Sequence, residues 1–130
     1  MFPVTENEIA KHIVDAAFKI HTTLGPRLFE SVYEAVMARE LSKRGLQFVR
    51  QQPLPVVWED LHLEDGFRAD LIVENKVIVE IKSVDAIAPV HRKQLLTYLR
   101  LANKRLGVLI NFDVDLIKDG IARVVNGLVQ

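Results

Sequence analysis

The segment 77–112 constrains the fold most, because three different apolar patterns follow one another within it. Residues 77–83 alternate in hydrophobicity, residues 89–103 place leucines at helical spacing, and residues 106–112 are nearly all apolar. A nearly continuous apolar run of this length is typical of a strand that is covered on both faces. Two strands joined by a helix are expected to pair in parallel through a right-handed crossover. The segment therefore predicts an α/β fold in which helices flank a mixed sheet.

The residues on either side complete a predicted order of α-α-β-β-β-α-β-β. Thr5 and Glu8 form a capping box before the first helix. Gly45 is the expected left-handed stop of the second helix. Pro53 and Pro55 indicate a strand at the edge of the sheet. The remaining predicted elements are helices at 6–22 and 28–44, short extended runs at 46–50 and 54–58, an acidic exposed turn region at 59–65, a strand at 66–73 and a short edge strand at 121–125.

Composition limits the classes of protein that the chain can represent. Its 130 residues fit one domain, residues 1–130, and the 49% hydrophobic content is that of a globular protein. The 17 basic residues balance 17 acidic ones, which argues against binding of nucleic acid by bulk electrostatics. The absence of cysteine excludes disulfides, zinc ribbons, iron–sulfur clusters and thiol nucleophiles. With no signal-peptide pattern and no apolar run of membrane-spanning length, we expect a cytoplasmic domain with no membrane contact.

Three charged residues interrupt strands that are otherwise apolar, namely Asp70, Glu80 and Lys82. Ionised groups are costly to bury unless they pair or bind metal. A three-residue turn at 74–76 would place Asp70 directly opposite Glu80, and two like charges in that position are destabilising. A divalent cation between them would convert the repulsion into coordination, and hard oxygen ligands suit Mg²⁺ or Mn²⁺.

A structural ion pair is the alternative interpretation of these residues. Glu80 and Lys82 are two residues apart and share one face of the sheet, so Lys82 could pair with Glu80 or with Asp70 without any catalysis. A Glu-x-Lys pair alone favours the ion pair. With the aspartate on the neighbouring strand, the ion pair and the metal site are equally favoured.

The predicted helix 89–103 offers a second candidate surface. Gln94 and Tyr98 lie four residues apart and therefore on one helix face. His91 is either a further phosphate contact or an ordinary polar surface residue. The segment 89–105 has no acidic residue, and its basic residues are Arg92, Lys93, Arg100, Lys104 and Arg105. Such a surface is a candidate for contacts with a phosphate backbone, and a solvated basic face is the alternative.

The ordered set of Asp70, Glu80-Ile81-Lys82, Gln94 and Tyr98 resembles the PD-(D/E)XK nuclease superfamily. More narrowly, four segments resemble the small GxxExxY proteins: LFESVY at 28–33, GFRAD at 66–70, VHRKQLLTY at 90–98 and LINF at 109–112. The first glycine of that motif is replaced by Arg27, whereas Glu30 and Tyr33 match its glutamate and tyrosine. We expect the lost glycine to concern the turn before the helix rather than the chemistry.

The resemblance implies a role for each of these residues. The metal ligands that it implies are Glu30, Asp70, Glu80 and the backbone carbonyl of Ile81. Lys82 would orient or activate water and stabilise the charge that develops on phosphorus. Gln94 and Tyr98 would position Lys82 and the scissile phosphate. Glu34, one turn after Glu30, either supports the metal or is a solvated helix glutamate.

The leading functional hypothesis is therefore a nuclease that uses Mg²⁺ or Mn²⁺ to hydrolyse phosphodiester bonds, with DNA as the expected substrate. The expected nucleic-acid contacts are His91, Arg92, Lys93 and Arg100. The first alternative is a catalytically inactive module of the same fold that binds nucleic acid or a protein partner. The second is a homo-oligomeric interaction domain whose polar strand residues are only ion-paired.

Overall fold

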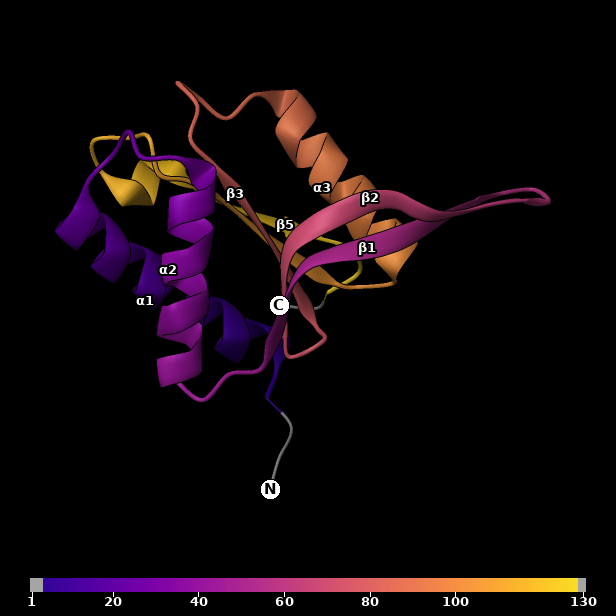
Figure 1. Ribbon diagram of the computed structural model, residues 1–130, viewed down its shortest axis with the longest axis horizontal. Helices are drawn as coiled ribbons and strands as arrows, with labels where there is room; N and C mark the ends of the chain where they lie inside the picture. Colours follow the sequence, from indigo (N-terminus) through magenta and orange to yellow (C-terminus); the bar gives the residue numbers. More distant parts are fainter. Residues whose placement is uncertain (1–3, 129–130) are drawn as a thin grey trace.

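Helices cover both faces of a five-stranded sheet in the computed structural model, which describes residues 4–128 (Figure 1). Helices α1 and α2 lie on one side of the sheet and α3 lies on the other (Figure 1). The elements in chain order are α1 (Glu6–Leu24), α2 (Glu30–Lys43), β1 (Phe48–Trp58), β2 (Leu61–Val73), β3 (Val77–Lys82), α3 (Pro89–Ala102), β4 (Leu106–Asn111), the 3₁₀ helix η1 (Ile117–Gly120) and β5 (Ile121–Val125). This arrangement confirms the predicted α/β class and the predicted order of helices and strands.

The sheet has the strand order β1-β2-β3-β4-β5. Strands β3 and β4, which α3 connects, pair in parallel, as the apolar patterns predicted. The other neighbouring pairs are antiparallel. Strands β1 and β5 lie at the two edges, which also agrees with the prediction. Among residues 4–128, no helix is both long enough and apolar enough to cross a membrane.

The alternation along β3 divides the buried side chains between two cores. Val79 and Ile81 belong to the larger core, which the apolar stripes of α1 and α2 complete. Ile78 faces the other way and joins Leu99 of α3 in the smaller core. Since side chains two residues apart share a face, Glu80 is directed to the same side of the sheet as Ile78.

The predicted ends of the first two helices are close to the observed ones. The Thr5 hydroxyl accepts a hydrogen bond from the Glu8 amide at 3.2 Å, which confirms one half of the capping box. Gly45 has a φ of 77° and follows the C-cap of α2, as expected for a left-handed stop. Helix α2 begins at Glu30 rather than at residue 28, because the backbone at Phe29 is still extended.

The prediction of two short runs separated by Pro53 was wrong. Pro53 pairs with Arg68 inside one long strand, β1, and the register shifts only between Leu54 and Val56. An edge strand tolerates proline because one row of its amides needs no partner in the sheet. The turn between β1 and β2 is also shorter than predicted, and β2 already begins at Leu61. As a result the end of this hairpin, residues 56–65, projects beyond the body of the protein (Figure 1); we call it the hairpin arm.

The turn between α1 and α2 contains an unusual backbone conformation at Arg27, whose φ is 73°. This is the left-handed region, which a residue with a Cβ atom occupies at a cost of about 1–2 kcal/mol. Glycine avoids that cost. The conformation explains in physical terms why a glycine would suit this position.

We therefore expect Arg27→Gly to stabilise the protein. The relief of backbone strain should exceed the entropy that glycine adds to the unfolded chain, leaving a net gain of about 0.5–1 kcal/mol. The free energy of unfolding from urea titration measures this gain. Arg27→Ala is the matched control: it also removes the 3.9 Å ion pair with Asp113 but keeps the Cβ atom, so it should give no gain. Equal stability of the two variants would contradict the strain.

Candidate active site

Two carboxylates meet just beyond the residue pairs that join β2 to β3. The pairing of Val73 with Val77 and of Leu71 with Val79 confirms the predicted three-residue turn and its register. The same register brings Asp70 and Glu80 together. The Asp70 amide donates to Glu80 Oε1 at 3.3 Å, and the amide of Ile81 donates to Asp70 Oδ2 at 2.8 Å.

The surroundings of this pair oppose its ionisation. Burial raises the pKa of Glu80 to about 8, and the neighbouring carboxylate of Asp70 adds to the shift. Burial also raises the pKa of Asp70, and the carboxylate of Glu34 contributes in the same direction. The ammonium group of Lys82 acts against both shifts without cancelling them. The pair therefore lacks the positive charge that would keep both carboxylates ionised.

Lys82 lies beside this pair without forming a close ion pair. It is half-buried at the end of β3, two residues after Glu80 on the same face. In the described part of the chain, no ion pair within 4.0 Å joins Lys82 to a carboxylate. The ion pair that the structural alternative requires is thus not formed.

Helix α2 contributes a third carboxylate, Glu34, to this region. Its side chain is buried, with 7% of its surface exposed, so the interpretation as a solvated helix glutamate was wrong. Arg50 Nε donates to Glu34 Oε2 at 3.0 Å. The side-chain Nε2 of Gln51 donates both to Glu34 Oε1 at 2.5 Å and to Asp70 Oδ1 at 3.2 Å. Gln51 therefore links the two carboxylates across β1.

Glu30 does not lie with Asp70 and Glu80, contrary to the expected convergence. Its Oε2 accepts a hydrogen bond from the Ser83 amide at 3.1 Å, just beyond the end of β3. Within residues 4–128, no three His, Cys, Asp or Glu side chains gather closely enough to bind one metal ion. Of the two glutamates of α2, it is Glu34 that shares a hydrogen-bond donor, Gln51, with Asp70.

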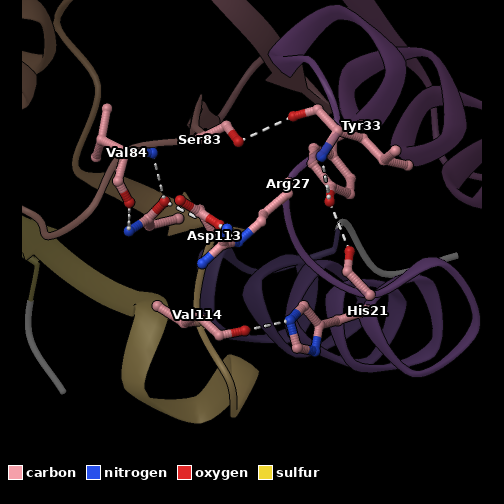
Figure 2. Close-up of polar contacts among 10 residues, drawn as sticks. His21, Arg27, Tyr33, Ser83, Val84, Asp113 and Val114 are labelled. Carbon is pink, nitrogen blue, oxygen red and sulfur yellow. Dashed lines mark hydrogen bonds and ion pairs between the residues drawn. The ribbon is translucent and has the colours of Figure 1, made fainter.

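A buried tyrosine fastens the turn before α2, and a serine joins that turn to the end of β3 (Figure 2). The Tyr33 hydroxyl donates to the Gly25 carbonyl at 2.6 Å and accepts from the Leu28 amide at 3.2 Å, while its ring stacks on Phe112 at 4.2 Å. The hydroxyl of Ser83 donates to the Leu28 carbonyl at 2.9 Å. These contacts fix the start of α2 against β3. The sequence analysis identified Tyr33 as the tyrosine of the motif but assigned no contact to its hydroxyl.

The chain that follows β4 is held in a similar way. Asn111, the buried last residue of β4, accepts from the amides of Val84 and Asp113 at 3.1 and 3.2 Å and donates to the Val84 carbonyl at 2.9 Å. His21 Nε2 lies 2.7 Å from the Val114 carbonyl, which joins α1 to this loop (Figure 2). A polar residue that ends an entirely apolar strand was the available signal for Asn111.

Tyr98 of α3 lies close enough to the carboxylates to feel their charges. Its ring stacks on Phe67 of β2, with centroids 4.1 Å apart. Burial raises the pKa of the Tyr98 hydroxyl, and the charges of Glu80 and Asp70 raise it further. Gln94 is exposed, one turn earlier, and among the described residues its side chain makes no hydrogen bond.

The other α3 residues predicted to contact nucleic acid lie on its surface. Arg92, Lys93 and Arg100 are exposed. His91 differs from them, because its Nδ1 accepts from the Ala88 amide at 3.0 Å and thereby caps the start of the helix. A capping role accounts for His91 without any phosphate.

A family model of the PD-(D/E)XK nuclease superfamily matches residues 7–124. The chain belongs to the PD-(D/E)XK nuclease superfamily. The match covers both carboxylate-bearing strands and α3, and the observed fold agrees with a restriction-endonuclease-like domain. Nucleases of this superfamily act on nucleic acid and generally use divalent metal ions. Searches of curated proteins and of solved structures find no match.

The residues at this PD-(D/E)XK site suit a divalent cation in their chemistry. Asp70 and Glu80 offer carboxylate oxygens, the hard donors that Mg²⁺ prefers. Mg²⁺ keeps several waters and needs only one or two protein carboxylates, so a pair suffices. The raised pKa of Glu80 also indicates a place where an added positive charge would be favourable.

We expect Glu80→Gln to stabilise the metal-free protein at neutral pH. A carboxyl whose pKa rises from 4.5 to about 8 on folding contributes stability below pH 4.5 and loses it as the pH increases toward 8. The loss at pH 7 should be on the order of 2–4 kcal/mol, since one pKa unit corresponds to about 1.4 kcal/mol. Glutamine keeps the acceptor for the Asp70 amide without the charge.

Melting curves in a chelator between pH 5 and pH 8 measure this effect. The wild type should lose more stability than Glu80→Gln as the pH increases. Glu64→Gln is the matched control, because that glutamate is exposed on the hairpin arm and should leave the pH dependence unchanged. Parallel curves for wild type and Glu80→Gln would contradict the raised pKa.

Proposed function

We propose that this protein is a metal-dependent nuclease that hydrolyses phosphodiester bonds in nucleic acid, with DNA as the expected substrate. The observation that carries the proposal is the pair formed by the buried Glu80 and the half-buried Asp70. Lys82 lies beside this pair and, among the described residues, forms no ion pair within 4.0 Å. Two neighbouring carboxylates with raised pKa values destabilise the free protein. Such groups are common at functional sites, which supports a binding or catalytic role for this pair.

Asp70, Glu80 and the carbonyl of Ile81 would hold Mg²⁺ or Mn²⁺. When bound, such an ion supplies a water of lowered pKa and polarises the phosphate. Of the two glutamates on α2, we assign the supporting role to Glu34 rather than Glu30, because Gln51 links it to Asp70. Glu30 would instead hold the end of β3 in place through the Ser83 amide.

Lys82 would orient the attacking water and stabilise the negative charge that develops on the phosphate oxygens. Tyr98, whose hydroxyl lies near the carboxylates of Asp70 and Glu80, would position the scissile phosphate. Gln94 would act with it from the preceding turn of α3.

Within the superfamily, we infer that the chain is a protein of the GxxExxY type. Arg27 occupies the position of the motif glycine and has the left-handed conformation that glycine adopts without strain. Tyr33 occupies the tyrosine position and fastens the same turn through its hydroxyl. Both observations support a structural role for the motif in the start of α2.

Replacement of Lys82 distinguishes the hypothesis of an enzyme from that of a catalytically inactive binding module. Lys82→Ala should leave metal-dependent DNA binding almost unchanged and slow cleavage by about a hundredfold or more, because the ammonium group acts mainly in the transition state. Lys11→Ala, an exposed lysine of α1, is the control. If Lys82 is instead structural, its loss should destabilise the fold by about 3–5 kcal/mol.

Cleavage assays with Mg²⁺ and Mn²⁺, thermal melting and DNA binding on the same samples distinguish these outcomes. A wild type that cleaves neither DNA nor RNA with either ion, together with a strongly destabilised Lys82→Ala, would overturn the proposed activity. Cleavage of RNA alone would overturn the choice of DNA.

The exposed basic residues of α3 are proposed to contact the phosphate backbone. Reversing Arg92, Lys93 or Arg100 to glutamate should weaken binding of duplex DNA and lower its salt dependence by a slope of about 0.9 for each lost contact. Reversal of Lys11 and Lys118, exposed lysines outside α3, is the control. Binding measured over a range of salt concentrations gives the slope, and an unchanged slope in all three α3 variants would place the surface elsewhere.

A further inference from the structure

Two elements of this neutral protein each carry charges of one sign. The hairpin arm, residues 56–65, carries Glu59, Asp60, Glu64 and Asp65 and has no lysine or arginine. Residues 89–105, which include α3, carry only basic charges. The two surfaces are therefore electrostatically complementary to each other.

The hairpin arm also exposes apolar side chains. Trp58 and Leu61 pair across the end of the hairpin and are 70% and 52% exposed, and Leu63, on the same face of the hairpin, is exposed as well. Soluble monomers rarely expose apolar residues in a contiguous group, and tryptophan is enriched among residues that dominate binding interfaces. The arm thus has an apolar centre and an acidic rim.

The outer face of α3 has the matching composition. Val90, Lys93, Thr97 and Leu101 follow helical spacing and are all exposed, with Val90 at 63%. Arg100 lies directly beside this stripe. In residues 4–128, none of the ion pairs within 4.0 Å involves Lys93 or Arg100.

The arm does not cover the α3 of its own chain. Its base is fastened to α3 by the stacking of Phe67 on Tyr98, and from there the hairpin continues past the helix with its tip beyond the body (Figure 1). Glu59, Asp60 and Glu64, near that tip, form no ion pair within 4.0 Å among the described residues. The complementary surfaces can meet only between two molecules.

We propose that two copies of this chain associate by docking the hairpin arm of each onto α3 of the other. A two-fold symmetric pair makes the contact twice and closes, so no further copies are added. Pairing of the arms with each other is disfavoured, because it would bring their carboxylates together. The same carboxylates disfavour a nucleic acid as the occupant of the arm.

This inference goes beyond the proposed nuclease activity and does not depend on it. The two are related, however, through α3. Phosphate groups and the acidic arm would compete for the same arginine and lysine side chains, so self-association would regulate access to that helix.

Reciprocal charge reversal tests the docking directly. One variant combines Glu59→Lys, Asp60→Lys and Glu64→Lys, and a second combines Lys93→Glu and Arg100→Glu. Each variant alone would bring like charges together, so each should be monomeric and its dimerisation weakened at least tenfold. In an equimolar mixture both contacts again join opposite charges, and dimers that contain one copy of each variant should form.

Sedimentation velocity at low and high salt measures the association, and circular dichroism verifies that each variant is folded. The wild type should be dimeric at low salt and dissociate as the salt increases, because charged pairs on a surface are screened. Trp58→Ser with Leu61→Ser, which leaves every charge in place, should also weaken the dimer.

Three results would overturn the proposal. The first is a wild type that stays monomeric at about 100 µM, where a dimer with a micromolar dissociation constant would be almost fully formed. The second is a variant mixture that stays monomeric. The third is a dimer that survives charge reversal of the arm, which would indicate another interface. Nuclease activity is not needed for any of these measurements, so a failure here leaves the proposed function to its own test.

Discussion

The register between β2 and β3 is the constraint on which the candidate site depends. Glu74 and Asn75 both adopt the left-handed conformation, with φ values of 52° and 55°, and the tight turn that they form aligns Val73 with Val77. Because side chains alternate between the two faces of a sheet, a slip of one residue would separate Asp70 from Glu80. The close approach of the two carboxylates is therefore a consequence of the turn and of the apolar side chains that are buried on both faces of β3, although the approach itself is unfavourable.

Hydrogen bonds from three other side chains fix the backbone around the end of β3. Tyr33, Ser83 and Asn111 use their polar groups on backbone atoms of the chain that leaves β3 and of the turn before α2. Such contacts satisfy buried donors and acceptors, and leaving one unpaired would cost about 1–3 kcal/mol. The carboxylates can therefore remain close without a rearrangement of the strands that carry them.

The sequence predicted some parts of this site well and others poorly, for physical reasons. The period of alternation and the length of the turn were sufficient to oppose Asp70 and Glu80. Periodicity shows which face of a helix is buried but not how far the helix lies along the sheet. Glu30 was expected from the motif resemblance, whereas Glu34 is the α2 glutamate that Gln51 links to Asp70. The continuation of β1 past Pro53 was also missed. A proline is a local signal for a break, whereas the pairing of β1 with β2 keeps this edge strand intact at Pro53.

The central claim is that Asp70 and Glu80 form a site for a divalent cation, and calorimetric titration of Mn²⁺ or Mg²⁺ into the purified protein tests it most directly. The account predicts saturable binding of one ion to each chain in the wild type and none in Asp70→Ala, with Asp65→Ala on the exposed hairpin arm binding as the wild type does. Absence of binding to the wild type, or equal binding to Asp70→Ala, would contradict the claim.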